Sequence, residues 1–294
     1  MPASLPLGHV VDTARITAIC RAFETERPDS IFRDPYARLF AGEESERMLA
    51  SWPGWKFTVA GCVVRTIVID RMIENAVRES DVDVVVNLGA GFDARPYRLE
   101  LPESLTWIEV DHEVVLTEKE QKLHAVEPKC VLRRIACDLA ETASRQSLLH
   151  EVALTASRAL LITEGLLVYL ADEEASQLTR EVTHTRCIEW WITDLVSRAG
   201  ISMIERTLRR APGPRDVQMR FTPAGAEFFQ RHGWNPEVAR SCVEEGSRRR
   251  RPIVAPAIWQ RAVSHEQRKM LRRLLLVLQL GRDGRRATKQ NPFL

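Results

Sequence analysis

The sequence predicts an α/β fold, in which a mostly parallel, twisted sheet carries helices on both faces and a helical cap at its N-terminal side. Three observations support this prediction. Strand-like and helix-like segments alternate through the middle of the chain, as crossover connections between parallel strands require. The first and fourth strand-like segments are apolar almost throughout, which is typical of strands buried on both faces. The first 80 residues show helical periodicity instead.

The expected strands are short runs rich in β-branched and aliphatic residues. They are residues 83–88, 105–110, 130–135, 159–163 and 188–193. Helical patterns fill the intervals, at about 112–124, 143–154 and 172–186. Trp190 and Trp191 are adjacent in the last strand, so their side chains should point to opposite faces of the sheet.

The N-terminal cap is expected to cover residues 1–80. Its helical patterns are residues 10–27, a short helix that opens at Asp34-Pro35, and the apolar stretch 57–79. Beyond it we expect an α/β domain over residues 81–280, with a substrate or lid region at about 196–250. Residues 281–294 should form a flexible tail.

The later part of the chain carries weaker signals. They predict a helix from Thr222-Pro223 to Gly233, a strand within 251–259, and a basic amphipathic helix at 265–280. The arginine run 246–252 is expected to be a solvated loop. We expect the basic helix to pack on its own core, and leave a homodimer open.

The composition is that of a folded protein without a strongly charged partner. The chain has 294 residues, 45% of them hydrophobic, and a net charge of +2, so nothing indicates nucleic acid or an anionic membrane as a partner. Six cysteines are scattered without a CxxC pair, which predicts buried thiols and no metal site. Since neither a signal peptide nor an apolar run of about 18 residues is found, we expect a soluble cytoplasmic protein.

A glycine turn follows the first strand. Gly89-Ala90-Gly91 opens a G-x-G-x-x-G/A pattern that ends at Ala94, and Asp111 closes the second strand about 20 residues later. Such a turn lets the backbone approach a nucleotide, and such an acid can hold ribose hydroxyls. The pattern fits a Rossmann-like site for a nicotinamide, a flavin or S-adenosylmethionine.

The charge of the residues at the strand ends distinguishes between these candidate cofactors. Acidic residues follow all five expected strands, where open α/β sheets bind their ligands. They are Asp93, Asp111, Asp138, Glu164 and Asp194. An acidic rim repels a pyrophosphate, at a cost of about 1 kcal/mol per charge pair at 4 Å in water. It attracts S-adenosylmethionine, which has a sulfonium and an ammonium group and no phosphate.

Four segments together resemble the leucine carboxyl methyltransferase-like family, which includes bacterial O-methyltransferases of natural-product pathways. The segments are "RPDSIFRDPYARLF", "VVNLGAGFDARPYRL", "WIEVDHEVVLTEKEQKL" and "LLITEGLLVYL", and the resemblance covers roughly residues 8 to 195. It implies a class I methyltransferase fold and S-adenosyl-L-methionine as the cofactor. It says little about the acceptor.

The resemblance also implies roles for single residues. Gly89, Ala90 and Gly91, with Asp93 behind them, would face the methionine part of the cofactor. Asp111 would bind the ribose, with His112 beside it, and Asp138 and Leu139 would hold the adenine. Glu164 would close the site near the sulfonium. Arg65 matches an arginine that holds a carboxylate, and Tyr169 matches a tyrosine near the acceptor.

Some of these roles have simpler alternatives. Asp138 could cap the following helix, and Tyr169 could be a core tyrosine. Arg65 lies in an apolar helix, where a guanidinium needs an anionic partner: the cofactor carboxylate, Asp70 or another acid of the protein.

The sequence therefore predicts a methyltransferase that acts on a carboxyl or hydroxyl group of a small, natural-product-like molecule. Methyl transfer from a sulfonium requires mainly alignment and the exclusion of water. A carboxylate acceptor needs no base, whereas a phenol would gain from one, and no base is named. A methyltransferase of protein C-terminal carboxyl groups, an NAD-dependent oxidoreductase and a catalytically silent cofactor-binding member remain alternatives.

Overall fold

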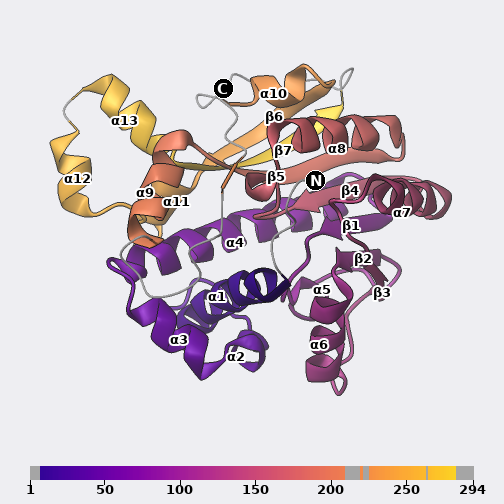
Figure 1. Cartoon of the computed structure of the whole chain (residues 1–294), viewed down its shortest axis with the longest axis horizontal. Helices are drawn as coiled ribbons and strands as arrows, with labels where there is room; N and C mark the ends of the chain where they lie inside the picture. Colours follow the sequence, from indigo (N-terminus) through magenta and orange to yellow (C-terminus); the bar gives the residue numbers. More distant parts are fainter. Residues whose placement is uncertain (1–6, 209–218, 221–224, 263, 283–294) are drawn as a thin grey trace.

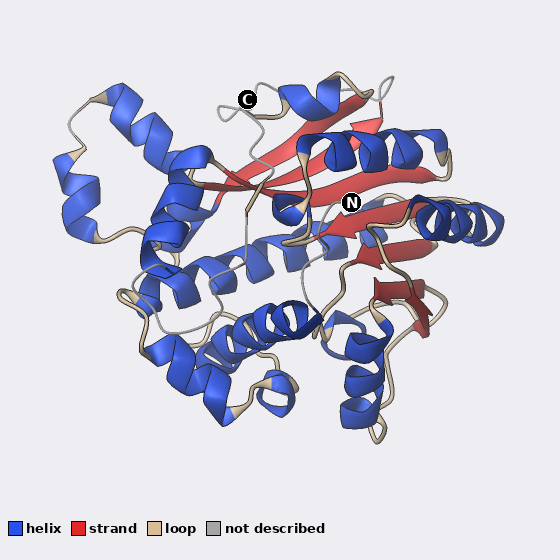
Figure 2. Cartoon of the chain, in the orientation of Figure 1, coloured by secondary structure: helices blue, strands red, loops and turns tan. Residues whose placement is uncertain are grey.

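A seven-stranded sheet forms the centre of the molecule (Figures 1 and 2). The computed structural model describes residues 7–208, 219–220, 225–262 and 264–282. The strands are β1 (Val84–Leu88), β2 (Thr106–Asp111), β3 (Val131–Ala136), β4 (Ala159–Thr163), β5 (Ile188–Val196), β6 (Trp234–Ser241) and β7 (Leu275–Arg282). The first five lie within a few residues of their predicted positions.

The strand order is β3-β2-β1-β4-β5-β7-β6. β1 to β5 are parallel to one another, whereas β7 runs antiparallel between β5 and β6. The chain moves outward from β1 to β3 and then returns to place β4 on the other side of β1. A crevice opens at such a reversal, beyond the carboxyl ends of the strands. The antiparallel β7 departs from the six-stranded order typical of dinucleotide-binding domains.

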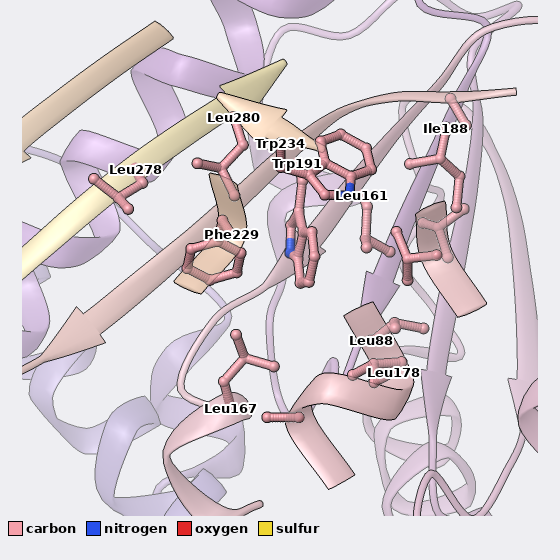
Figure 3. Packing of buried hydrophobic residues seen from close by; sticks show 14 of the residues in the cluster. Leu88, Leu161, Leu167, Leu178, Ile188, Trp191, Phe229, Trp234, Leu278 and Leu280 are labelled. Carbon is pink, nitrogen blue, oxygen red and sulfur yellow. The ribbon is translucent and has the colours of Figure 1, made fainter. Parts of the chain in front are cut away.

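Helices cover both faces of the sheet. One face packs against α7 (Thr142–Thr155), α8 (Asp172–His184) and α10 (Glu227–Gln230). The other packs against α4 (Trp55–Glu79), α11 (Cys242–Arg248) and α13 (His265–Arg272). Trp191 belongs to the first core and Trp190 to the second, which confirms that the adjacent tryptophans point to opposite faces. Figure 3 shows Trp191 packed among Phe229, Trp234 and leucines of the sheet.

The N-terminal segment is helical, as predicted. It consists of α1 (Leu7–Thr25), α2 (Ala37–Phe40), α3 (Glu43–Ala50) and α4. The first three helices and the start of α4 share a small apolar cluster that includes Ile19, Cys20 and Leu49. The rest of α4 packs directly on the sheet, so this layer and the sheet share a core.

The remaining helices are short or lie outside these two layers. They are α5 (Arg95–Arg98), α6 (Glu113–Leu123), the 3-10 turn η1 (Leu167–Tyr169), α9 (Arg198–Leu208) and α12 (Pro256–Arg261). Among the helices of the described ranges, none has the length and apolar character of a membrane span.

Three predictions in the late part of the chain are wrong. The arginine run 246–252 is not a solvated loop, because its first residues belong to α11 (Cys242–Arg248) and Arg251 is buried. Residues 251–259 form no strand: they lead into α12. The helix predicted over 265–280 ends at Arg272, and β7 follows. The apolar run that ends in β7 fits either period, and burial between β5 and β6 makes it a strand. β6 was not predicted. The expected helix start at Thr222-Pro223 and nearly all of the expected tail lie outside the described residues.

Candidate functional site

The glycine turn after β1 adopts a backbone that favours glycine. Gly89 and Gly91 have φ angles of +68° and +48°. The N–H groups of Gly89 and Ala90 donate to the carbonyl of Val110 at 2.8 and 3.0 Å, which holds the turn against the end of β2. A Cβ at Gly89 would lie 3.2 Å from Leu166, in the loop after β4. The turn is therefore tightly packed as well as left-handed.

Asp111, the last residue of β2, braces this turn. Its Oδ2 accepts a hydrogen bond from the Gly91 N–H at 2.7 Å, and its Oδ1 accepts from the N–H of His112 at 2.8 Å. His112 precedes the first residue of α6, so Asp111 joins the glycine turn, β2 and α6. Its side chain is buried.

Asp138 and Leu139 follow β3. The Asp138 carboxylate is exposed and accepts from the N–H of Ala140 at 2.9 Å. This bond forms a local turn before α7, which begins only at Thr142, so Asp138 does not cap that helix. The carbonyl of Leu139 accepts from Arg145 at 2.7 Å.

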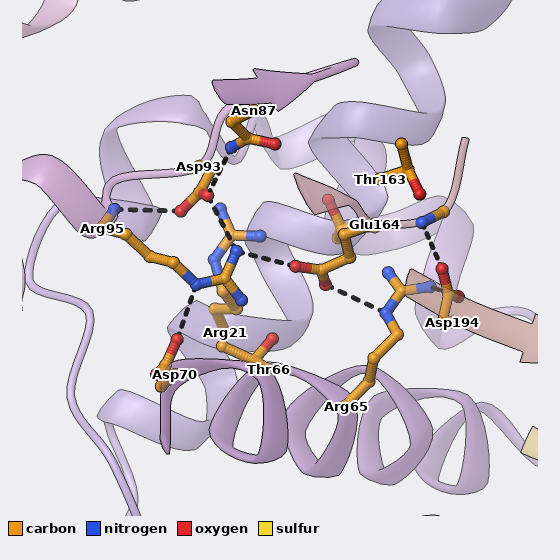
Figure 4. A network of polar contacts seen from close by, with 12 residues as sticks. Arg21, Arg65, Thr66, Asp70, Asn87, Asp93, Arg95, Thr163, Glu164 and Asp194 are labelled. Carbon is orange, nitrogen blue, oxygen red and sulfur yellow. Dashed lines mark hydrogen bonds and ion pairs between the residues drawn. The ribbon is translucent and has the colours of Figure 1, made fainter. Parts of the chain in front are cut away.

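Arg65 lies on α4 and reaches the ends of two strands (Figure 4). Its Nε donates to Glu164 at 3.0 Å and its Nη1 donates to Asp194 at 2.9 Å. The second oxygen of Asp194 accepts from the N–H of Gly165 at 2.7 Å. The acidic partners of Arg65 are thus at the ends of β4 and β5. Asp70, which the sequence also offered as a partner of Arg65, pairs with Arg95 instead.

Arg95, which was not predicted as a site residue, is the centre of the adjoining network. Its Nε contacts Asp70 at 2.6 Å, and its Nη1 contacts Asp93 at 2.8 Å and Glu164 at 2.7 Å. Its side chain is only 2% exposed, and its Nη2 has no hydrogen-bond partner among the described residues. The position of Arg95 directly after the glycine turn was the available signal in the sequence.

Arg21 is the second arginine that was not predicted. It comes from α1, and it donates to Asp34 at 2.8 Å and to the carbonyl of Phe92 at 2.6 Å. The second bond fixes α1 to the glycine turn. A sequence pattern cannot reveal this contact because 71 residues separate its partners.

These arginines correct the expectation of a uniformly acidic rim. Asp93, Glu164 and Asp194 are paired with Arg65 or Arg95. Burial by itself raises the pKa of Asp93, but Arg95 and other nearby cations outweigh burial and lower this pKa to about 2. Burial likewise opposes ionisation of Glu164, yet Arg95 and Arg65 lower its pKa overall.

Unneutralised negative charge remains at one end of the site. Within the described ranges, no ion pair joins the carboxylates of Asp111 or Asp138 to a basic side chain. Both residues lie at the ends of β2 and β3, on one side of the glycine turn. The electrostatic attraction for a cation is therefore localised there rather than spread over the rim.

A cavity of about 860 Å³ lies beside the glycine turn and the ends of these strands. The sequence-predicted site residues line it together: Arg65, Gly89, Ala90, Gly91, Asp93, Asp111, His112, Asp138, Leu139, Glu164 and Tyr169. Much of its remaining wall is apolar and comes from α3, the α3–α4 turn, the start of α4, α9 and α12. It includes Met48, Trp52, Phe57, Met203, Ile204 and Ile258. The site thus has a polar part and an apolar part.

Tyr169, in η1, lines the same cavity. Its hydroxyl makes no hydrogen bond to another residue of the described ranges. Burial raises the pKa of Tyr169, and Asp194 raises it further while Arg65 lowers it. The phenol therefore stays protonated at neutral pH, as a neutral donor and acceptor.

The residues present fit S-adenosyl-L-methionine. The left-handed glycine turn offers backbone without side chains, and two carboxylates lie beside it without a basic partner among the described residues. The buried, unpartnered Nη2 of Arg95 is a donor suited to an anionic group. The N–H groups of Gly89, Ala90 and Gly91 already donate to Val110 and Asp111, so these three donors are not available to a pyrophosphate.

Comparison with known proteins decides the family. The family model "Leucine carboxyl methyltransferase" matches residues 14–183, more than half of the chain. The chain belongs to the leucine carboxyl methyltransferase family. The match ends in α8, so it includes the glycine turn and the ends of β1 to β4 but neither β5 nor α9.

Relatives of this chain extend the match. A proposed S-adenosyl-L-methionine-dependent methyltransferase of Streptomyces avermitilis is 29% identical over 271 residues, 83% of this chain and 89% of the relative. Another, from Parafrankia sp., is 35% identical over 181 residues, 58% of each chain. A third, from Mycobacteroides abscessus, is 31% identical over 58% of this chain and 60% of the relative. The match therefore spans less than two thirds of the length of the last two relatives.

Solved structures share the fold. A DUF574 family protein from Streptomyces avermitilis superposes with a TM-score of 0.59 at 16% identity, over 92% of this chain and 97% of that one. A proposed methyltransferase from Thermobifida fusca gives a TM-score of 0.52 at 12% identity, over 92% and 94%. The predicted family and Rossmann-like fold are confirmed. The expected enzyme class and cofactor, those of an S-adenosyl-L-methionine-dependent methyltransferase, are confirmed at the level of the family.

Proposed function

We propose that this methyltransferase transfers a methyl group from S-adenosyl-L-methionine to an oxygen of a small, largely apolar molecule. One observation carries the proposal: a single cavity joins the glycine turn and two carboxylates without a basic partner in the described ranges to an apolar chamber. The cofactor supplies an electrophilic methyl group on a sulfonium when bound. The chamber excludes water and provides room for an acceptor.

The polar end would bind the cofactor. We propose that Asp111 accepts hydrogen bonds from the ribose and that Asp138 and the Leu139 backbone contact the adenine. Gly89, Ala90 and Gly91 would leave space for the methionine portion. Glu164 is held by Arg65 and Arg95, so it would present fixed negative charge toward a cationic group without moving.

Arg65 and Tyr169 would act at the junction of the two ends. The Arg65 guanidinium carries a permanent charge, since Asp194 and Glu164 raise its pKa against the effect of burial. Its pairing with both carboxylates gives it a fixed position, from which it would orient an anionic acceptor. The Tyr169 hydroxyl would donate a hydrogen bond to the acceptor.

The groups at this junction favour a carboxylate acceptor over a phenol. Asp194 and Glu164 are occupied by Arg65, and the raised pKa of Tyr169 keeps it protonated. Among the described residues that line the cavity, His112 is the one histidine, and it lies at the polar end. A carboxylate is already ionised at neutral pH and needs none of these groups as a base.

The test is methyl transfer from S-adenosyl-L-methionine labelled at the methyl group to a panel of apolar carboxylic acids and phenols. A product that releases methanol in mild base is a methyl ester, whereas a stable product is an ether. Transfer to either supports the proposal, and esters support the preferred acceptor. Binding of NADH in place of S-adenosylhomocysteine, or transfer only to peptide C-termini, would overturn it in favour of the corresponding alternative.

A further inference from the structure

Two cysteines that are 42 positions apart meet in the wall of the cavity. Cys62, on α4, packs against the small apolar cluster that contains Cys20 of α1, and the two thiols lie within hydrogen-bonding reach of each other. Cys62 also contacts the carbonyl of Thr17, with 3.6 Å between sulfur and oxygen. Both cysteines line the cavity, and Cys62 is partly exposed there. The scattered cysteines of the sequence thus include a spatial dithiol.

The surroundings of the pair distinguish its two members. Charged groups face it from α1 (Arg21), from α4 (Arg65) and from the loop after β4 (Glu164). The thiol of Cys20 has the largest effect on the pKa of Cys62 and lowers it, and Arg65 and Arg21 lower it as well. Together they outweigh burial and Glu164 and bring this pKa to about 7. The thiol of Cys62, together with burial, raises the pKa of Cys20. Near neutral pH the pair holds a thiolate beside a thiol.

Other cysteines in the chain provide an internal comparison. Cys130, Cys137 and Cys242 are buried. Cys187 is half-buried like Cys62, but burial raises its pKa. Cys62 is therefore the cysteine in which exposure and thiolate character coincide, as reactivity requires.

We propose that Cys20 and Cys62 form a reversible disulfide when a peroxide oxidises the pair. The Cys62 thiolate attacks the peroxide O–O bond and becomes a sulfenic acid, and the released oxygen takes up a proton to leave as water. The sulfur of Cys20 then attacks the sulfenic sulfur, and its proton leaves with the hydroxyl group as a second water. The two thiols supply the two electrons that reduce the peroxide.

Such a bond would tie α1 to α4 at the glycine turn. Arg21, next to Cys20, already donates to the carbonyl of Phe92 at 2.6 Å. A Cβ built on Gly91 would lie 3.5 Å from the Cβ of Ala14, which is on α1. α1 therefore covers the turn. Fixing α1 covalently would slow the entry and release of whatever the turn binds, independently of the identity of the acceptor.

The first experiment maps the bond. The full-length protein is treated with hydrogen peroxide near pH 7.5, the remaining thiols are blocked, and the peptides are analysed by mass spectrometry. We expect a linked pair of peptides containing Cys20 and Cys62, about two mass units lighter than the sum of the reduced peptides and separable by dithiothreitol. Cys187→Ser should form the same link. Oxidation of Cys62 only to sulfinic acid, or random linkage, would overturn the proposal.

Two further measurements protect the test from variants that fail to fold. In the unmodified protein, Cys62 should react with iodoacetamide faster than Cys187 at neutral pH; equal rates would contradict the assigned thiolate. Fluorescently labelled S-adenosylhomocysteine should dissociate several-fold more slowly from the oxidised protein than from the reduced one. The difference should vanish in Cys62→Ser and in Cys20→Ala, and an unchanged release rate on oxidation would refute the tie between α1 and the turn.

Discussion

The backbone N–H of Gly91 donates a 2.7 Å hydrogen bond to Oδ2 of Asp111. This bond joins the glycine turn after β1 to the end of β2, at the point where the strand order reverses on either side of β1. The same carboxylate is the one that we propose to contact the ribose. Its role in folding and its role in binding can be separated by substitution.

Asp111→Asn keeps an oxygen that can accept from Gly91 but removes the charge. The amide nitrogen of Asn cannot accept from the N–H of His112, so we expect the variant to fold with a loss of stability of about 1 kcal/mol. It should bind S-adenosylhomocysteine roughly tenfold or more weakly, because hydrogen bonds to charged groups contribute about 1.5–3 kcal/mol. Isothermal titration calorimetry measures the affinity, and the exposed Glu113→Gln is the control. An Asn variant with unchanged affinity would exclude Asp111 from the site.

Arg65 should stabilise the fold as well as the site. Arg65→Ala leaves Glu164 and Asp194 partly without a cation in a buried setting, which typically costs about 3–5 kcal/mol. Arg65→Lys keeps one charge but not the fork that reaches both acids, and we expect intermediate stability with low methyl transfer. Denaturant unfolding and turnover test the two effects. An Ala variant as stable as the parent protein would contradict the network in Figure 4.

Tyr169→Phe isolates the hydroxyl. Because this hydroxyl has no partner within the described residues, the variant should be as stable as the parent protein and should bind S-adenosylhomocysteine equally well. If the hydroxyl orients the acceptor, kcat/KM should fall roughly tenfold, the equivalent of one hydrogen bond. Steady-state kinetics with an acceptor from the panel gives this ratio. Unchanged kinetics would mean that Tyr169 only lines the cavity and does not orient the acceptor.

Asp93 should make the free energy of unfolding depend on pH in the acidic range. Its pKa of about 2 lies below the ordinary value of 3.8, so ionised Asp93 stabilises the folded state above about pH 4, and this contribution is lost as the pH falls toward 2. The loss is on the order of 2 kcal/mol. Urea unfolding at pH 6 and pH 2.5 should show a larger decrease for the parent protein than for Asp93→Asn. Equal decreases would show that Asp93 is not the group responsible.

The arginine run near residue 250 contains one buried ion pair. Arg251 donates from Nε and Nη2 to the two oxygens of Glu24, both at 2.8 Å, and both side chains are almost fully buried. Arg251→Ala should lower the free energy of unfolding by about 3–5 kcal/mol. Arg248→Ala, at a side chain that is 70% exposed, should change it by less than about 1 kcal/mol. Equally small losses in both variants would mean that the whole run is solvated, as its sequence suggests.

Local sequence determined the first five strands and the glycine turn. Period, β-branching and the glycines act within a few residues, so β1 and β4 could be recognised as strands buried on both faces. The positions of Asp111, Asp138 and Glu164 followed from the ends of those strands. The N-terminal helices could be predicted equally well, because their apolar positions recur with the helical period.

Tertiary structure decided what these patterns could not. The run that ends in β7 is apolar enough for a helix or a strand, and pairing with β5 and β6 makes it a strand. The rim of acids seemed unopposed in the sequence, because Arg65 reaches Glu164 and Asp194 from the distant helix α4. Cys20 and Cys62 were two separate buried thiols until the packing of those helices joined them. Each of these outcomes depends on contacts between distant segments, for which neighbouring residues provide no signal.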